Sequence, residues 1–214
     1  MSQVAVSRSY KVSSRLTVRL QEFPHRKRFP KCEHCGQGHY WNVVWPSARV
    51  MSRFLATDAA KLGLKGRRAL VIGCGAGLES VVAAKMGAEV TVLDHSGEAL
   101  RLTRENCVLN NIDDVHTTRR CWLDGVGIAR LRRFDLVLGC DVLYNIGKKE
   151  VVNRLLSSAL KREGIALFAE PERIGAKDPR RLLDGTEFQI EATTSRVGSD
   201  GIEVHIYRVR HRDA

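Results

Sequence analysis

Apolar runs and amphipathic segments alternate along most of the chain, from about residue 69 to residue 209. Continuous apolar runs of roughly four to eight residues are typical of buried strands, whereas apolar residues spaced by three and four are typical of helices. On this pattern we expect strands over residues 69–72, 88–94, 115–120, 134–141, 164–170, 187–193 and 202–209. Helices are expected over residues 78–86, 97–109, 148–160 and 180–183.

The last two expected strands flank a turn at residues 198–201. So short a connection joins antiparallel neighbours, because a parallel pair needs a long crossover. The earlier strands are separated by helices, as in parallel sheets. The sequence therefore predicts an α/β fold with one mostly parallel, Rossmann-like sheet of seven strands that ends in a C-terminal antiparallel hairpin. A chain of 214 residues is long enough for one such domain.

Residues 1–40 differ in character from the rest of the chain, and we expect them to form a short N-terminal arm before a domain at residues 41–214. Residues 14–20 alternate like an edge strand. Residues 23–35 are basic and contain proline, which is typical of a loop. We expect this arm to cover the sheet or to form part of a substrate entrance.

The formal net charge is +11, and the isoelectric point is near 9.7. Such an excess of basic residues favours a partner with an acidic surface, or nucleic acid. The basic residues are spread along the chain without interleaved aromatic residues. A generally basic, solvated surface is therefore the favoured interpretation, an acidic protein partner comes next, and nucleic acid comes last.

The chain has no apolar run of about 18 residues and no apolar leader after Met1. Its six cysteines lie mostly within predicted strands, helices and their ends, which favours reduced thiols over a disulfide framework. We therefore expect a cytoplasmic protein without a membrane-spanning segment.

A glycine-rich turn that contains Gly73, Gly75 and Gly77 joins a strand to a helix, and Asp94 ends the next strand. Glycines allow the backbone to approach a ligand closely, and an acid in that place can bind both ribose hydroxyls. A dinucleotide fingerprint requires a third glycine where this chain has Leu78. The spacing instead suits S-adenosylmethionine, which has no phosphate. The alternative is a turn that only lets the helix pack close to the sheet.

Asp141 and Tyr144 follow the strand expected at residues 134–141, at the edge where doubly wound sheets bind ligands. Methyl transfer to nitrogen requires a lone pair held in line with the methyl group. A carboxylate can orient an incoming amine, and a tyrosine can form one wall of the slot. We take both residues as candidate catalytic residues. The alternatives are that Asp141 braces the turn and that Tyr144 only packs.

Five segments between about residue 41 and residue 171 carry a combined signal. They are residues 45–55, the glycine turn, residues 83–88, residues 106–110 and residues 141–144. Their order and spacing resemble the family-16 protein methyltransferases, which include lysine methyltransferases of the electron-transfer flavoprotein β-subunit and of chaperones.

This resemblance implies a seven-strand methyltransferase fold, with S-adenosylmethionine as the cofactor. It also implies that Trp45 lines the cofactor site, that Asp94 binds the ribose and that the motif of Asp141 and Tyr144 faces the target lysine. Cys140, which precedes that motif, is placed among the cofactor-binding residues.

The chain departs from the family after the third strand, where the family has Asp-Trp with the acid near the adenine amino group. Here the two residues are Cys121 and Trp122, and Asp124 lies two residues beyond. We expect Trp122 to stack near the adenine, with core packing as the alternative.

The predicted activity is S-adenosylmethionine-dependent N-methylation of a lysine in a protein. A nucleic-acid methyltransferase is the first alternative. The Pro-Pro pair of amino-methylating enzymes that act on bases is replaced here by Val142 and Leu143, which disfavours a base. A small-molecule substrate and a non-catalytic binding module are the further alternatives. The presence of both Asp94 and Asp141 disfavours the last.

Cys32 and Cys35 form a Cys-x-x-Cys motif in the arm, with His39 four residues further on and His25 before it. Cysteine and histidine are zinc ligands, so the motif is compatible with a structural zinc site, and two nearby cysteines are also compatible with a redox pair. No second Cys-x-x-Cys exists to complete a tetrahedron, so an ordinary loop is the favoured interpretation and no metal is predicted.

Overall fold

The computed structural model describes residues 4–24, 31–33, 35–36, 38, 40–123, 128, 131–143, 149–172, 178–197 and 201–213. Tyr144, His25, His39 and Asp124 lie outside the described residues, so what the sequence analysis expects of them stays a prediction.

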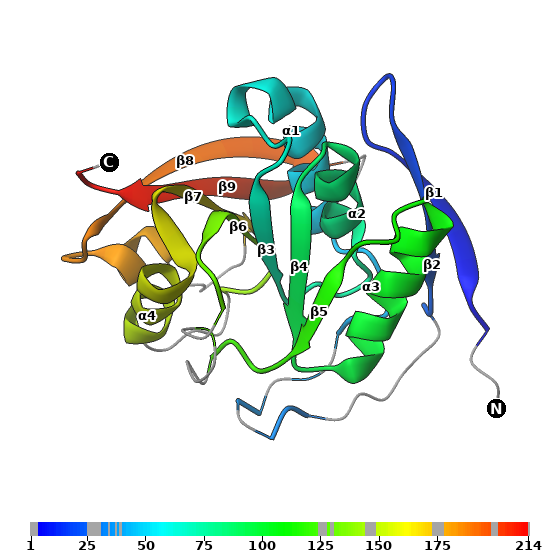
Figure 1. Cartoon of the computed structure of the whole chain (residues 1–214), viewed down its shortest axis with the longest axis horizontal. Helices are drawn as coiled ribbons and strands as arrows, with labels where there is room; N and C mark the ends of the chain where they lie inside the picture. The colour runs from blue at the N-terminus through cyan, green and yellow to red at the C-terminus, as the bar shows by residue number, and fades with distance from the viewer. Residues whose placement is uncertain are drawn as a thin grey trace.

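One sheet of seven strands runs through the molecule in the order β5-β4-β3-β6-β7-β9-β8 (Figure 1). Strands β3 to β7 pair in parallel, and β9 is antiparallel to both of its neighbours. The turn at residues 198–201 predicted its pairing with β8. The elements in chain order are β1 (Val6–Lys11), β2 (Thr17–Glu22), α1 (Pro46–Leu62), β3 (Arg68–Ile72), α2 (Leu78–Lys85), β4 (Glu89–Asp94), α3 (Gly97–Leu109), β5 (His116–Arg119), β6 (Phe134–Cys140), α4 (Lys149–Ala159), β7 (Leu160–Pro171), the 3-10 helix η1 (Pro179–Leu183), β8 (Phe188–Val197) and β9 (Ile202–His211).

The core has two layers, because successive side chains of each strand point to opposite faces of the sheet. In β3, Ala69 and Val71 pack in one apolar cluster with residues of α1, α2 and α3. Leu70 and Ile72 pack in a second cluster with residues of α4 and η1. Both faces of the sheet are therefore covered, which explains why its strands have continuous apolar runs.

Two elements have no counterpart among the strands and helices expected from the sequence. Helix α1 begins at Pro46, a residue that is favourable in a first helical turn. It ends at Leu62, and the C-cap residue Gly63 has a left-handed conformation. Strand β1 has three consecutive exposed residues and little apolar patterning. Strand β7 begins at Leu160, four residues before the expected start, and its pairing with β6 shifts register there.

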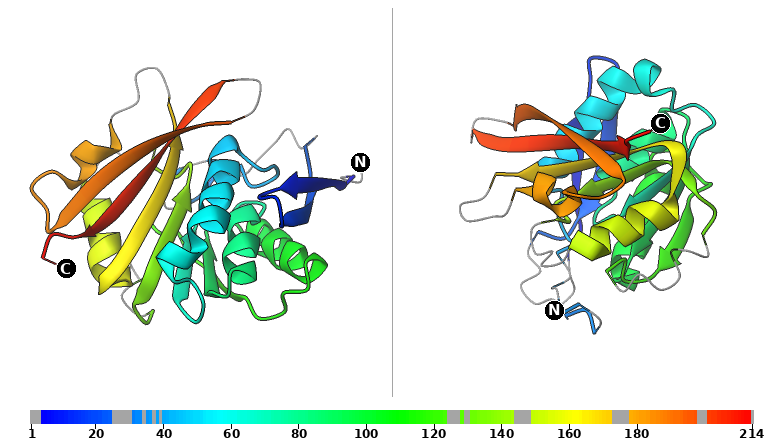
Figure 2. Two further views of the ribbon diagram at one scale, coloured as in Figure 1. Left: turned by 90° about the horizontal axis from the view of Figure 1, so that it is seen from above. Right: turned by 90° about the vertical axis from the view of Figure 1, so that its left-hand side faces the viewer.

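The expected strand of the arm is β2, but it starts at Thr17 and pairs with β1 in a separate two-stranded sheet. Figure 2 shows this hairpin standing apart from the seven-stranded sheet. Its buried face carries Val18, Leu20 and Glu22. The free edge of β2 is held by α3, because the Asn106 and Asn110 side chains bond to the backbone of β2 in place of another strand.

No helix in the described part of the chain is long and apolar enough to cross a membrane.

Candidate active site

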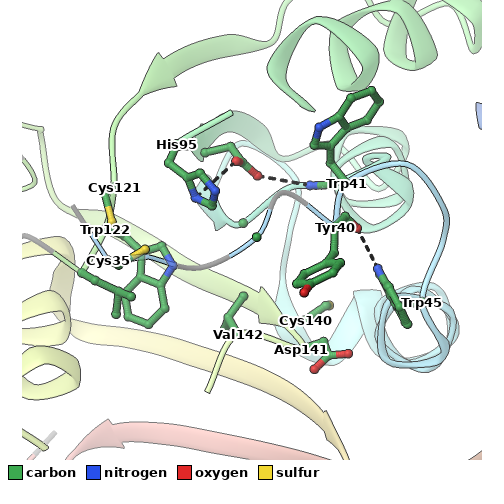
Figure 3. A pocket seen from close by; sticks show the side chains of 15 residues that line it. Cys35, Tyr40, Trp41, Trp45, His95, Cys121, Trp122, Cys140, Asp141 and Val142 are labelled. Atoms are coloured by element: carbon green, nitrogen blue, oxygen red, sulfur yellow. Dashed lines mark hydrogen bonds and ion pairs between the residues drawn. The ribbon is translucent and has the colours of Figure 1, made fainter. Parts of the chain in front are cut away.

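A cavity of about 310 Å³ lies at the carboxyl ends of β3, β4 and β6 (Figure 3). The sheet order reverses between β3 and β6, since β4 and β5 follow on one side and β7 on the other. Ligands of open α/β sheets bind at such a reversal, because adjacent loops there diverge to opposite faces. Gly73, Asp94 and Asp141 line the cavity, so the structure brings the two motifs found in the sequence into one site.

Gly73 turns the chain sharply at the end of β3. Its φ is +63°, and a Cβ atom at this position would meet the Val142 side chain at 2.9 Å, so both conformation and space require glycine. Gly75 also lines the cavity. Gly77 is the N-cap of α2 and is not among the described lining residues. Its N–H donates to the Cys74 carbonyl oxygen at 2.8 Å, so it stabilises the turn.

Asp94 is only 6% exposed at the end of β4. Its Oδ1 accepts a hydrogen bond of 2.8 Å from the Ser96 backbone N–H, and its Oδ2 lies 3.5 Å from the Gly75 nitrogen. Ser96 in turn caps α3 by accepting from the Ala99 N–H. The start of α3 and the glycine turn therefore fix the orientation of this carboxylate.

Asp141 follows the last residue of β6 and has a φ of +58°, a left-handed conformation that is uncommon for residues other than glycine. Its N–H donates to the Ala169 carbonyl oxygen at 2.8 Å. The next two N–H groups, those of Val142 and Leu143, both donate to Oε1 of the buried Glu170. A carboxylate on β7 therefore stabilises the turn that carries Asp141, and strained residues held in this way are frequent at functional sites.

Aromatic side chains form much of the remaining wall. Trp45 is 40% exposed, and its indole N–H donates to the Tyr40 carbonyl oxygen at 2.9 Å. Tyr40 and Trp41 line the cavity beside it. Trp122 also lines the cavity and belongs at the same time to the buried cluster that includes residues of α4. Its packing in the core is therefore observed, and its stacking near the adenine stays a prediction.

The charges that face the cavity are acidic. Among the described lining residues there is no lysine or arginine, whereas Asp94 and Asp141 are both present. His95 is adjacent, and burial lowers its pKa, which favours the neutral imidazole. Burial raises the pKa of the Cys140 thiol well above its usual value, so this side chain is a neutral part of the wall. Such a site suits a cationic ligand and not a pyrophosphate.

Most of the expected site residues therefore meet in one cavity. Those among its lining residues are Trp45, Gly73, Gly75, Asp94, Trp122, Cys140 and Asp141. Tyr40, Trp41 and His95 also line the cavity and were not among the expected site residues. Glu170, which bonds to the turn after Asp141, was not expected at the site either. Cys121 lines the cavity too, and its thiol lies beside those of Cys32 and Cys35.

The sequence model of a family described as lysine methyltransferase matches residues 32–180. The chain belongs to this family. It is 34% identical over 170 residues to the protein N-lysine methyltransferase METTL21A of Danio rerio, a match that covers 78% of this chain and 75% of that protein. It is 32% identical over 120 residues to the histone-arginine methyltransferase METTL23 of Mus musculus, covering 55% of this chain and 46% of that protein.

Solved structures agree on the fold of this lysine methyltransferase family member. Magnesium protoporphyrin IX methyltransferase from Synechocystis PCC 6803, crystallised with bound S-adenosylmethionine, has a TM-score of 0.57 at 20% identity, covering 82% of this chain and 86% of that chain. The chain is accordingly an S-adenosylmethionine-dependent methyltransferase. The acidic cavity without lysine or arginine among its described residues fits this cationic cofactor.

Proposed function

We propose that this enzyme methylates the side-chain amine of a lysine in a protein substrate. The observation that carries the proposal is the position of Asp141, which lines the same cavity as Gly73, Gly75 and Asp94 and is held there by a strained turn. The family and the protein N-lysine methyltransferase of Danio rerio give further support.

The cofactor is proposed to bind with its ribose on Asp94 and its amino-acid part beside Gly73 and Gly75. The carboxylate of Asp94 can accept hydrogen bonds from both ribose hydroxyls. Trp122 is assigned to the adenine end, and Trp45 and Cys140 are assigned to the wall near the methyl group. Gly77 is assigned to support of the turn, since it is absent from the described lining.

When bound, S-adenosylmethionine supplies an activated methyl group on a sulfonium. The residues of the chain must then align the amine, because transfer is an in-line displacement. The Asp141 carboxylate attracts the lysine ammonium and, once the proton has been lost to water, accepts a hydrogen bond from the neutral amine so that the lone pair points at the methyl carbon. Tyr144, three residues further along the chain, is proposed as a wall of the lysine slot.

An acidic protein partner is also proposed. A second hollow of about 740 Å³ is lined by Arg8, Arg49 and Arg53 among others, and α1, which carries two of these arginines, begins beside the cavity residue Trp45. With a net charge of +11, a basic surface there favours association with acidic segments. None of the described cysteines forms a disulfide, which supports a reducing compartment such as the cytoplasm.

The test is to incubate the purified enzyme with S-adenosylmethionine carrying a radiolabelled methyl group and a lysate from cells that lack the gene. Label is expected in protein, and mass spectrometry of the labelled protein is expected to find methyl-lysine. Label confined to nucleic acid or to small molecules would contradict the proposal. Methyl-arginine or methyl-histidine as the labelled residue would contradict the choice of lysine while leaving methyl transfer to protein intact.

A further inference from the structure

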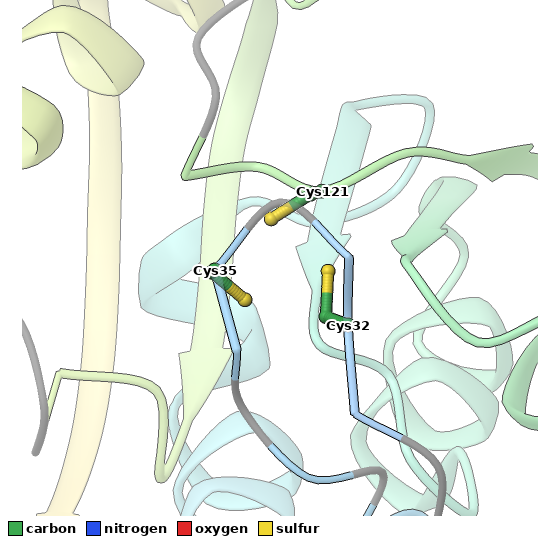
Figure 4. A group of neighbouring side chains, drawn as sticks. All are labelled: Cys32, Cys35 and Cys121. Carbon is green, nitrogen blue, oxygen red and sulfur yellow. The ribbon is translucent and has the colours of Figure 1, made fainter.

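Three cysteine thiols converge beside the cofactor cavity. The sulfur atoms of Cys32, Cys35 and Cys121 all lie within 4.8 Å of one another (Figure 4). Cys32 and Cys121 are buried, and none of the three residues forms a disulfide. Two of them come from the arm and the third from the loop that follows β5, so the cluster joins segments that are far apart in the sequence.

The local backbone turns the two arm thiols toward the same side. The Gly36 N–H donates to the Cys32 carbonyl oxygen at 2.8 Å, and Gly36 has a φ of +69°, so the chain reverses directly after Cys35. An antiparallel bridge between Lys31 and Gly38 closes this tight turn. The Cys-x-x-Cys motif therefore sits at the tip of a small hairpin, with Cys121 facing it from the other side (Figure 4).

We propose that Cys32, Cys35 and Cys121 bind a zinc ion that fastens the arm to the wall of the cofactor cavity. Tetrahedral zinc with Zn–S bonds of about 2.3 Å places its sulfur ligands about 3.8 Å apart. This spacing is compatible with three thiols that all lie within 4.8 Å of one another. Thiolates are soft ligands, which favours zinc over magnesium or calcium. This site goes beyond the methyltransferase activity and differs from the metal-free arm expected from the sequence.

Zinc binding at this site is a proton-linked ligand exchange. The three thiols lose their protons to water and three Zn–S bonds form, which leaves the cluster with a net charge of −1. No oxidant or reductant is consumed. The described residues give three ligands in this cluster, and the fourth position is filled by water or by a donor outside it.

The ion would act on the cofactor cavity through the residues that carry its ligands. Cys35 and Cys121 both line that cavity. Trp122, which follows Cys121, lines it as well, as does Tyr40 at the end of the arm. Zinc would therefore hold two aromatic walls in place, and we expect its removal to weaken the affinity for S-adenosylmethionine by about 10-fold or more.

The test begins with the metal content of the full chain, purified without a metal-affinity step. About one zinc per chain is expected. Cobalt substituted for the zinc should produce the near-ultraviolet charge-transfer absorption of thiolate ligands. Cys121→Ser should lose both signals, whereas Cys107→Ala, which removes a buried thiol of α3 outside the cluster, should keep them.

A second measurement uses the wild-type chain alone, so that a variant that fails to fold does not obscure the result. Zinc is removed with a chelator, and the apo protein is titrated with zinc while its affinity for S-adenosylmethionine is followed. Stoichiometric rebinding that restores the affinity supports the proposal. Metal-free protein without a cobalt–thiolate band, a Cys32–Cys35 disulfide in the purified chain, or full zinc in Cys121→Ser would each overturn it. None of these readouts depends on methyl transfer.

Discussion

Asp94 is the residue on which cofactor binding depends most directly, because it offers a buried carboxylate at the end of β4. Asp94→Ala should weaken S-adenosylmethionine binding by about 1–3 kcal/mol through the loss of charged hydrogen bonds. Isothermal titration calorimetry measures the effect. Asp113→Ala, at an exposed position outside the cavity, serves as the control and should bind normally. If a folded Asp94→Ala variant bound S-adenosylmethionine as tightly as the wild type, Asp94 would not be the residue that binds the ribose.

Glu79 gives the stability of the protein a specific pH dependence. Burial in the first turn of α2 raises its pKa from 4.5 to about 7, and the nearby Asp94 carboxylate adds to the rise. The folded state favours the protonated form of Glu79. The resulting contribution to the free energy of unfolding is fully present below pH 4.5 and is lost as the pH rises through about 7.

Glu79→Gln should remove this component, which is of the order of 1–3 kcal/mol. Denaturant unfolding at a series of pH values would show it as a flatter curve for the variant than for the wild type. Parallel curves for the two proteins would mean that Glu79 does not titrate in this range.

Site residues at strand ends could be read from the sequence, because the end of a buried apolar run marks the ligand-binding edge of the sheet. Asp94 and Asp141 are of this kind. Tyr40 and Trp41 could not be read in this way, since they reach the cavity from a segment outside the regular alternation. The side-chain bonds of Glu170 to the turn after Asp141 depend on the pairing of β6 with β7, and no local pattern encodes that pairing.

At the scale of elements, α3 couples the arm to the cofactor turn. The Asn106 side chain accepts a hydrogen bond from the Gln21 N–H at 2.7 Å and donates to the Gln21 and Ala76 carbonyl oxygens. Ala76 lies within the glycine turn, so one buried side chain links β2 to the turn that borders the cavity.

Asn106→Ala should lower the free energy of unfolding by about 1–3 kcal/mol, because it leaves buried backbone groups without partners. It should also weaken cofactor binding, since the turn loses a support. Glu105→Ala, on the exposed side of the same helix, is the matched control. Chemical denaturation and calorimetry follow the two effects, and a variant as stable as the control would contradict this coupling.

The elements of the central sheet followed from periodicity, and α3 was predicted with the observed bounds, Gly97–Leu109. The expected strand of the arm is present but starts later, and its partner β1 was not foreseen because its side chains alternate poorly. Helix α1 was also not foreseen. In both cases tertiary contacts stabilise a segment with a weak local signal, since β1 pairs with β2 and α1 packs against the sheet.

At the scale of the whole molecule, the excess of basic residues should govern the encounter with substrate. Methylation of the labelled proteins in a lysate should slow as salt is added, because screening weakens long-range attraction. Arg49→Glu combined with Arg53→Glu should reduce labelling further while leaving cofactor affinity unchanged, since neither residue lines the cofactor cavity. Labelling that is insensitive to salt and to both charge reversals would contradict an acidic partner.

Asp94 and Asp141 are proposed to have separate roles in one cavity, in which Asp94 binds the cofactor and Asp141 aligns the lysine. The most direct test measures the turnover of protein lysine methylation and the calorimetric affinity for S-adenosylmethionine in Asp141→Asn, with the exposed Asp184→Asn as the control. Turnover is expected to fall by about 100-fold or more, while cofactor affinity is expected to stay close to that of the wild type. Normal turnover in Asp141→Asn, or a joint loss of cofactor binding and stability, would mean that this carboxylate only braces the turn.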